Sequence, residues 1–78
     1  MTRKEFTTKH EAEIAKISNA LKGQGFDLGM AESVFVNAAM HGKIPDGDDP
    51  CVRAALATVG GSAYWEAVHE EWETVKDE

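Results

Sequence analysis

The most apolar run of the sequence is LGMAESVFVNAAM at 28–40, and its side chains are spaced as in a helix. Only Glu32, Ser33 and Asn37 are polar there. At about 100° per residue, one broad face collects Ala31, Val34, Phe35, Ala38 and Ala39. Val36 and Met40 fall on the other side. A helix that is apolar on more than one side is central or shared between subunits, so we expect the chain to pack around a helix over 28–41.

The residues before this run predict an arm followed by a helix. Residues 1–7 are expected to form a flexible or loosely docked N-terminal arm. Thr8 is followed three residues later by Glu11, which is the spacing of a capping box. The pattern therefore predicts a helix over about 8–22, and its narrow apolar stripe consists of Ile14, Ile17 and Leu21.

Two more helices are predicted after the central one. Residues 43–50, KIPDGDDP, are rich in proline, glycine and aspartate, which favour a solvated loop. Asp49 followed by Pro50 is a strong helix start, so a helix is expected over 50–59. Gly60 and Gly61 break it, and apolar spacing predicts a last helix over 63–76. No alternating pattern of strands is present, so we expect an all-α protein: a compact bundle of four short helices forming a single domain over residues 8–78.

Size and composition place the chain among small globular proteins. Its 78 residues make one domain, which at this length buries only roughly 60% of the surface of the unfolded chain. Such a core leaves little surplus stability, which is consistent with self-association. No apolar run approaches the roughly 18 residues of a membrane span, and the N-terminus lacks the apolar stretch of a signal peptide. With one cysteine, Cys51, the chain has no internal disulfide, so we expect a cytoplasmic protein and no membrane contact.

The charge of the chain is distributed unevenly. Residues 1–22 carry five bases and three acids, a balance of +2, whereas residues 23–78 carry three bases and eleven acids, a balance of −8. An acidic body repels phosphate, which argues against nucleic acid as a partner. The same charge favours another protein with a basic surface.

The sequence offers no convincing metal site. Asp46, Asp48 and Asp49 suggest calcium, but in an EF-hand loop that starts at Asp46 the sixth position is cysteine and the twelfth alanine, where glycine and glutamate are needed. Glu66 and His69 have the Glu-x-x-His spacing of di-metal bundles, which require two copies and further glutamates. We therefore predict no bound metal and no cofactor.

Catalytic motifs are absent as well. The sequence has no G-x-S-x-G element and no glycine-rich phosphate loop that opens a helix. Cys51 starts a predicted helix, where its thiolate would be stabilised, but Asp48 and Asp49 oppose that effect. We therefore expect no catalytic residue and no enzymatic activity.

One short segment resembles a known family. Residues 20–26, ALKGQGF, followed by a helix, a loop and a third helix, are similar to the first turn of a ubiquitin-associated domain. The resemblance covers about 45 residues and rests on Gly25 and Phe26. Gln24 stands where that family uses a methionine for contact, and the last predicted helix has no counterpart there. The resemblance assigns the chain to no family.

The remaining candidates are surfaces. Val36, Met40 and Trp65 are the predicted apolar anchors of a partner-binding site, and Glu66, Glu70 and Glu73 are expected to pair with lysine or arginine of the partner. Small acidic chains without motifs are typical of accessory regulators and of phage-borne inhibitors, which include anti-CRISPR proteins. The sequence therefore predicts a non-enzymatic protein-binding module that inhibits or regulates a larger complex by occlusion.

Two alternatives stay open. The first is a DNA-binding regulator or antitoxin that uses the basic first helix, where Lys9, Lys16 and Lys22 lie. A helix-turn-helix requires a second basic helix, but the helix predicted over 28–41 has no lysine or arginine. The second alternative is a structural homodimer with the central helix as its seam.

Overall fold

The computed structural model describes residues 1–47 and 49–76, which form one helical globule with a radius of gyration of 11.6 Å. Asp48, assigned above to the loop, and residues 77–78 lie outside this part. The described residues contain five α-helices, a short 3-10 helix η1 and no strand. In chain order these are α1 (Arg3–Lys9), α2 (Glu11–Ala20), η1 (Lys22–Gln24), α3 (Leu28–His41), α4 (Pro50–Val59) and α5 (Ser62–Trp72). The all-α prediction is confirmed, but the predicted number of helices, four, was wrong.

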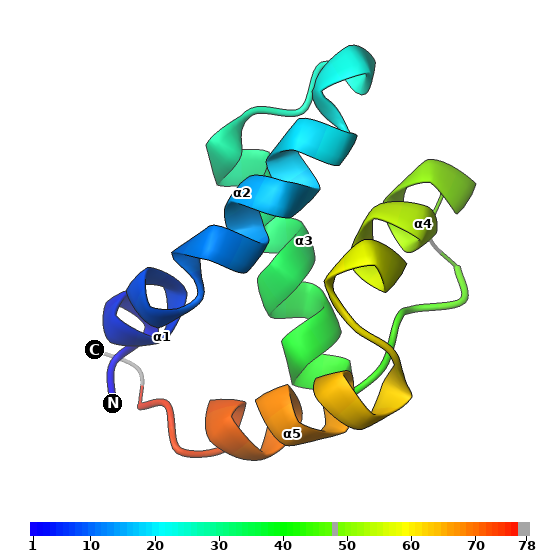
Figure 1. The fold of residues 1–78 in the computed structure, drawn as a ribbon. Coiled ribbons are helices and arrows are strands. Elements are labelled where there is room, and N and C mark those ends of the chain that lie inside the picture. Colours follow the sequence, from blue (N-terminus) through cyan, green and yellow to red (C-terminus); the bar gives the residue numbers. More distant parts are fainter. Residues whose placement is uncertain (48, 77–78) are drawn as a thin grey trace.

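Helix α3 shares the centre of the fold with α2, because α1 and most of α4 pack against α2, whereas α5 packs against α3. The expectation that the chain packs around the helix over 28–41 alone is therefore met only in part. Helix α3 contacts α2, α4 and α5, and Figure 1 shows its C-terminal end at α5. The Asp27 side chain accepts a hydrogen bond from the Met30 amide at 2.8 Å, which caps the first turn. Gly42 ends the helix in a left-handed conformation, with φ 71°. The helix predicted over 28–41 is confirmed, as is the one over 50–59.

The N-terminus differs most from the prediction. Where a loose arm was expected, Thr2 and Glu5 form a capping box that starts α1. Phe6 on this helix is fully buried, which holds α1 against the body of the protein. The helix predicted over 8–22 is also interrupted, because His10 has φ −104° and ψ 21° and separates α1 from α2. The capping-box spacing of Thr8 and Glu11 therefore does not start a helix, and the same spacing six residues earlier does.

The last helix is shorter than predicted. Helix α5 ends at Trp72 instead of Lys76. Thr74 and Val75 are β-branched, which disfavours helix, and the Thr74 hydroxyl donates to the Glu71 carbonyl at 2.6 Å. The chain then turns back to the N-terminus, where the Lys76 amide donates to the Met1 carbonyl at 2.9 Å. The two ends of the described chain therefore lie side by side (Figure 1).

The core is a continuous apolar cluster to which all five α-helices contribute. Its largest fully buried side chains are Trp65, Phe6, Phe35, Ile17, Leu21 and Leu56. The Phe35 ring lies 5.9 Å from Phe6 and 5.4 Å from Trp65, measured between centroids, so aromatic contacts join α1, α3 and α5.

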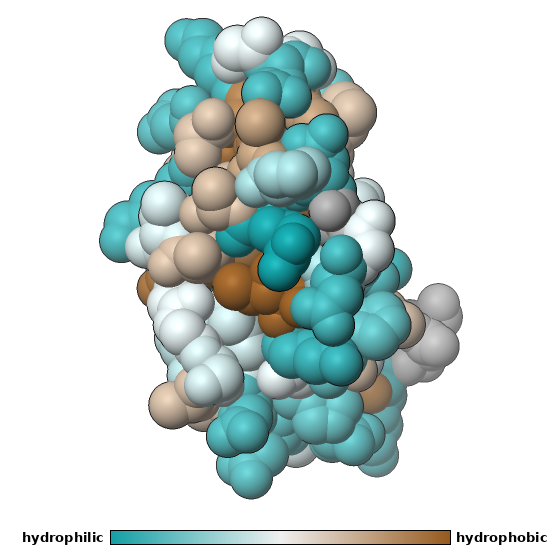
Figure 2. All heavy atoms as spheres, turned by 90° about the vertical axis from the view of Figure 1, so that its right-hand side faces the viewer, coloured by the Kyte–Doolittle hydropathy of each residue, from teal (hydrophilic) through white to brown (hydrophobic). Residues whose placement is uncertain are grey.

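Hydrophilic residues cover much of the face of the molecule that Figure 2 shows. Hydrophobic residues appear near the centre of this view and toward its top, with hydrophilic residues around them (Figure 2). None of the helices in residues 1–47 and 49–76 combines the length and the apolar character that crossing a bilayer requires.

Candidate protein-binding surface

The solvent face of α5 carries a stripe of carboxylates. Glu66, Glu70 and Glu73 follow the spacing i, i+4 and i+7, which places them above one another along the helix, and all three are exposed. Buried Trp65 and Val68 lie on the other side of the helix. α5 contains no lysine or arginine, and the one basic side chain on it is that of His69. We call Glu66, Glu70 and Glu73 the α5 acidic face.

His69 connects the α5 acidic face to the end of α3. Its Nδ1 lies 3.0 Å from the Ala39 carbonyl, and its Nε2 lies 3.3 Å from Glu73 Oε1. Met40 follows Ala39 in the sequence and is half exposed, at 50%. Met40 is therefore an exposed apolar side chain at the end of α3, next in sequence to the residue that contacts His69 of α5.

Two of the predicted contact residues lie in the interior. Val36 is 3% exposed and Trp65 is fully buried. The indole Nε1 of Trp65 donates to the Gly60 carbonyl at 3.1 Å, so even its polar atom is satisfied inside the protein. Neither side chain offers a surface to a partner in this structure. Met40 and the three glutamates of the α5 acidic face are the predicted site residues that remain accessible.

A polar cluster that sequence reasoning missed joins α1 and α2 to α5. One carboxylate oxygen of Glu71 accepts a hydrogen bond from Lys9 Nζ, and the other oxygen contacts His10 Nε2. Both distances are 2.6 Å. The other ring nitrogen of His10 is 3.1 Å from Glu13. Burial raises the pKa of Glu71, but the hydrogen bonds and positive charges of Lys9 and His10 outweigh it and hold this pKa below the ordinary 4.5. The contacts of Glu71 with Lys9 and His10 span 62 and 61 residues of sequence, and no local pattern signals them.

Replacing Glu71 by glutamine is expected to lower stability at pH 7 by about 1–2 kcal/mol, because two charge-assisted hydrogen bonds are weakened. The folded-state pKa of Glu71 is lower than 4.5, so its contribution is complete above that pH and is lost as the pH falls through the folded value. Thermal unfolding followed from pH 7 to pH 3 should therefore show a shallower acid loss for Glu71→Gln than for wild type. Glu70→Gln, at the exposed neighbouring position, is the control and should keep the wild-type profile. Identical profiles for Glu71→Gln and wild type would contradict this role.

Tyr64 carries a buried hydroxyl beside the same cluster. No polar atom of the described residues forms a hydrogen bond with it. Burial raises the pKa of Tyr64 to about 12, and the negative charges of Glu13 and Glu71 act in the same direction. The phenol is therefore neutral near pH 7.

Metal-ligating and basic side chains are dispersed. In residues 1–47 and 49–76, no three histidine, cysteine, aspartate or glutamate side chains are placed to hold a metal ion together. Cys51 is exposed, and its Sγ accepts a hydrogen bond from the side-chain Nε2 of Gln24 at 3.0 Å. The bases expected on one first helix are divided among α1, α2 and η1, and Lys9 is engaged by Glu71.

Comparisons of the chain with protein-family models, with curated proteins and with solved structures found no match. What the α5 acidic face can do follows from its chemistry. Exposed carboxylates accept charge-assisted hydrogen bonds from lysine and arginine, and these bonds matter most where the partner excludes water. Pairs that stay in water contribute little.

Proposed function

We propose that this protein is a non-enzymatic binding module that covers a basic surface of a larger protein and so inhibits or regulates it. The observation that carries the proposal is the α5 acidic face, three exposed carboxylates in line on a helix without lysine or arginine. A net charge of −6 supports it, because the field of the whole molecule attracts a basic partner. Phage-borne inhibitors of the anti-CRISPR type are one class that would act in this way.

In the proposed mechanism, charge and apolar contact have separate roles. Glu66 and Glu70 pair with lysine or arginine of the partner, and Glu73 joins them at the cost of its contact with His69. Met40 supplies apolar contact from the end of α3. The charges speed association and select the partner, whereas affinity comes from the pairs and the apolar area that lose water on binding.

The proposal predicts that the triple variant Glu66→Gln, Glu70→Gln, Glu73→Gln loses its partner. Tagged wild-type protein should capture one or a few proteins from lysate at about 150 mM salt, and the triple variant should bind the purified partner at least about tenfold more weakly by calorimetry. Among single variants, Glu70→Gln should weaken binding more than Asp46→Asn, which removes one exposed carboxylate from the loop before α4. Equal affinity of the triple variant and wild type, or no capture above empty beads, would contradict the proposal.

One observation favours a second candidate function, a structural homodimer. Helix α3 leaves three large apolar side chains exposed: Leu28 at 60%, Met30 at 46% and Met40 at 50%. At about 100° per residue, Met30 and Met40 lie within about 80° of one another around the helix axis and can form a seam between two copies, whereas Leu28 lies on another side of the helix. Light scattering of wild type and of Met40→Glu separates the two candidates, because a dimer would show twice the chain mass in wild type and a lower mass in the variant. A monomer mass for both removes the homodimer.

A further inference from the structure

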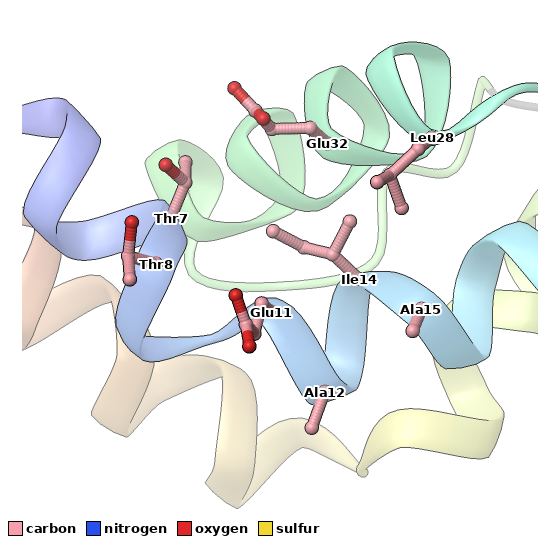
Figure 3. Close-up of a pocket in the computed structure, with 8 residues that line it drawn as sticks. All are labelled: Thr7, Thr8, Glu11, Ala12, Ile14, Ala15, Leu28 and Glu32. Atoms are coloured by element: carbon pink, nitrogen blue, oxygen red, sulfur yellow. The ribbon is translucent and has the colours of Figure 1, made fainter.

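A groove with a volume of about 420 Å³ lies between α2 and the first turns of α3, next to the end of α1. Figure 3 shows its walls: Thr7 and Thr8 from α1, Glu11 and Ile14 from α2, and Leu28 and Glu32 from α3. This volume is in the range of binding pockets, which is about 300–1,000 Å³. None of these residues belongs to the α5 acidic face.

The two ends of the groove differ in polarity. Leu28 and Ile14 point toward one another at one end, and the threonines lie at the end near α1 (Figure 3). Ile14 is 3% exposed and forms the floor, whereas Leu28 is 60% exposed and covers that floor only in part. An apolar group of a partner would bury both the exposed leucine and the floor below it.

The charged side chains that line the groove are acidic. Glu11 and Glu32 both line it, and no lysine or arginine does. Among residues 1–47 and 49–76, neither carboxylate takes part in an ion pair or a side-chain hydrogen bond. A neutral or acidic occupant would desolvate these carboxylates without compensation, which is costly. A cationic occupant provides the missing partner.

We propose that this groove binds a basic amphipathic segment of a partner protein. A lysine or arginine of the segment pairs with Glu11 and Glu32, its aliphatic stem lies along the groove, and an adjacent apolar side chain packs on Leu28 and Ile14. A second copy of this chain is the less suitable occupant, because two bodies with a net charge of −6 repel each other. The inference does not depend on the α5 acidic face.

The test is a titration of ¹⁵N-labelled protein with an amphipathic peptide of about 14 leucines and lysines, followed by NMR. The control peptide has glutamate in place of every lysine. The lysine peptide should shift the amide signals of Glu11, Leu28 and Glu32, and the glutamate peptide should not. Binding should weaken at least about tenfold in Glu11→Gln/Glu32→Gln and at least about threefold in Leu28→Ala. The matched variant Glu66→Gln/Glu70→Gln should bind within about twofold of wild type.

Three outcomes would overturn the proposal. Peptide shifts confined to α5 would support the function proposed above and remove the groove. Equal affinity of wild type and Glu11→Gln/Glu32→Gln would show that the groove carboxylates take no part. Groove signals that move with protein concentration in the absence of peptide would identify a second copy as the occupant.

Glu11 is exposed, so Glu11→Gln alone repeats the test if the double variant has a changed circular dichroism spectrum.

Discussion

Phe6→Ala is expected to lower the free energy of unfolding by about 3–5 kcal/mol, because it removes a fully buried ring and leaves a cavity. The Phe6 ring packs against three other rings. The distances between ring centroids are 4.9 Å to His10, 5.9 Å to Phe35 and 5.3 Å to Trp72. A chain of 78 residues has a total stability of about 4–12 kcal/mol. The expected loss is therefore at least about a quarter of the total stability.

Urea denaturation followed by circular dichroism checks this prediction. Lys4→Ala on the same helix is the control, because Lys4 is exposed, and its effect should stay within about 0.5 kcal/mol. If Phe6→Ala changed stability no more than Lys4→Ala, α1 would not be docked. The loosely attached arm that the sequence suggests for residues 1–7 would then be the better description.

Gly60→Ala is expected to destabilise the protein by about 1–3 kcal/mol through overpacking. A Cβ atom at this position would lie 2.5 Å from both Cβ and Cγ of Tyr64. These atoms are attached directly to the first turn of α5, so they cannot move aside without moving the helix. The backbone of Gly60 is extended, with φ 177°, which any residue adopts. The penalty is therefore a clash between the α4–α5 connection and α5.

Gly61→Ala is the matched control for Gly60→Ala. A Cβ at Gly61 meets no atom within 4 Å, and its φ is −89°. Alanine there reduces the entropy of the unfolded chain but is a poorer N-cap than glycine, so the two effects oppose each other and the net change should stay within about 1 kcal/mol. Thermal and urea unfolding of both variants measure the difference. Equal stability of the two variants would contradict the close contact at Gly60.

Both proposed surfaces are acidic, but they belong to different parts of the fold. The α5 acidic face lies on one helix, whereas the groove requires α1, α2 and α3 to be in place. Phe6→Ala therefore gives a further distinction between them. Loosening α1 should weaken peptide binding in the groove, since Thr7 and Thr8 form one end of it. The carboxylates on α5 would still be exposed.

The sequence by itself determined the elements whose signals are local. Asp27 before α3 and the Asp49–Pro50 pair before α4 cap helices within three residues, and apolar spacing repeats within one turn. Such interactions depend on residues close in sequence, so the helices over 28–41 and 50–59 were predicted with their bounds. The exposed carboxylates of α5 were also predicted, because they follow helical spacing opposite an apolar stripe.

Only the tertiary structure decided which of two equivalent local signals applies and which apolar side chains are buried. Thr2 with Glu5 and Thr8 with Glu11 have the same spacing, and the burial of Phe6 against α3 and α5 favours the first. Val36 lies opposite the broad apolar face of its helix, and Trp65 was expected to contact a partner. Both are buried because helices from elsewhere in the chain pack against them. The same holds for the groove and for the contact of His10 with Glu71, 61 residues apart. Periodicity shows that a helix has an apolar side, but the packing of distant helices determines how much of that side is covered.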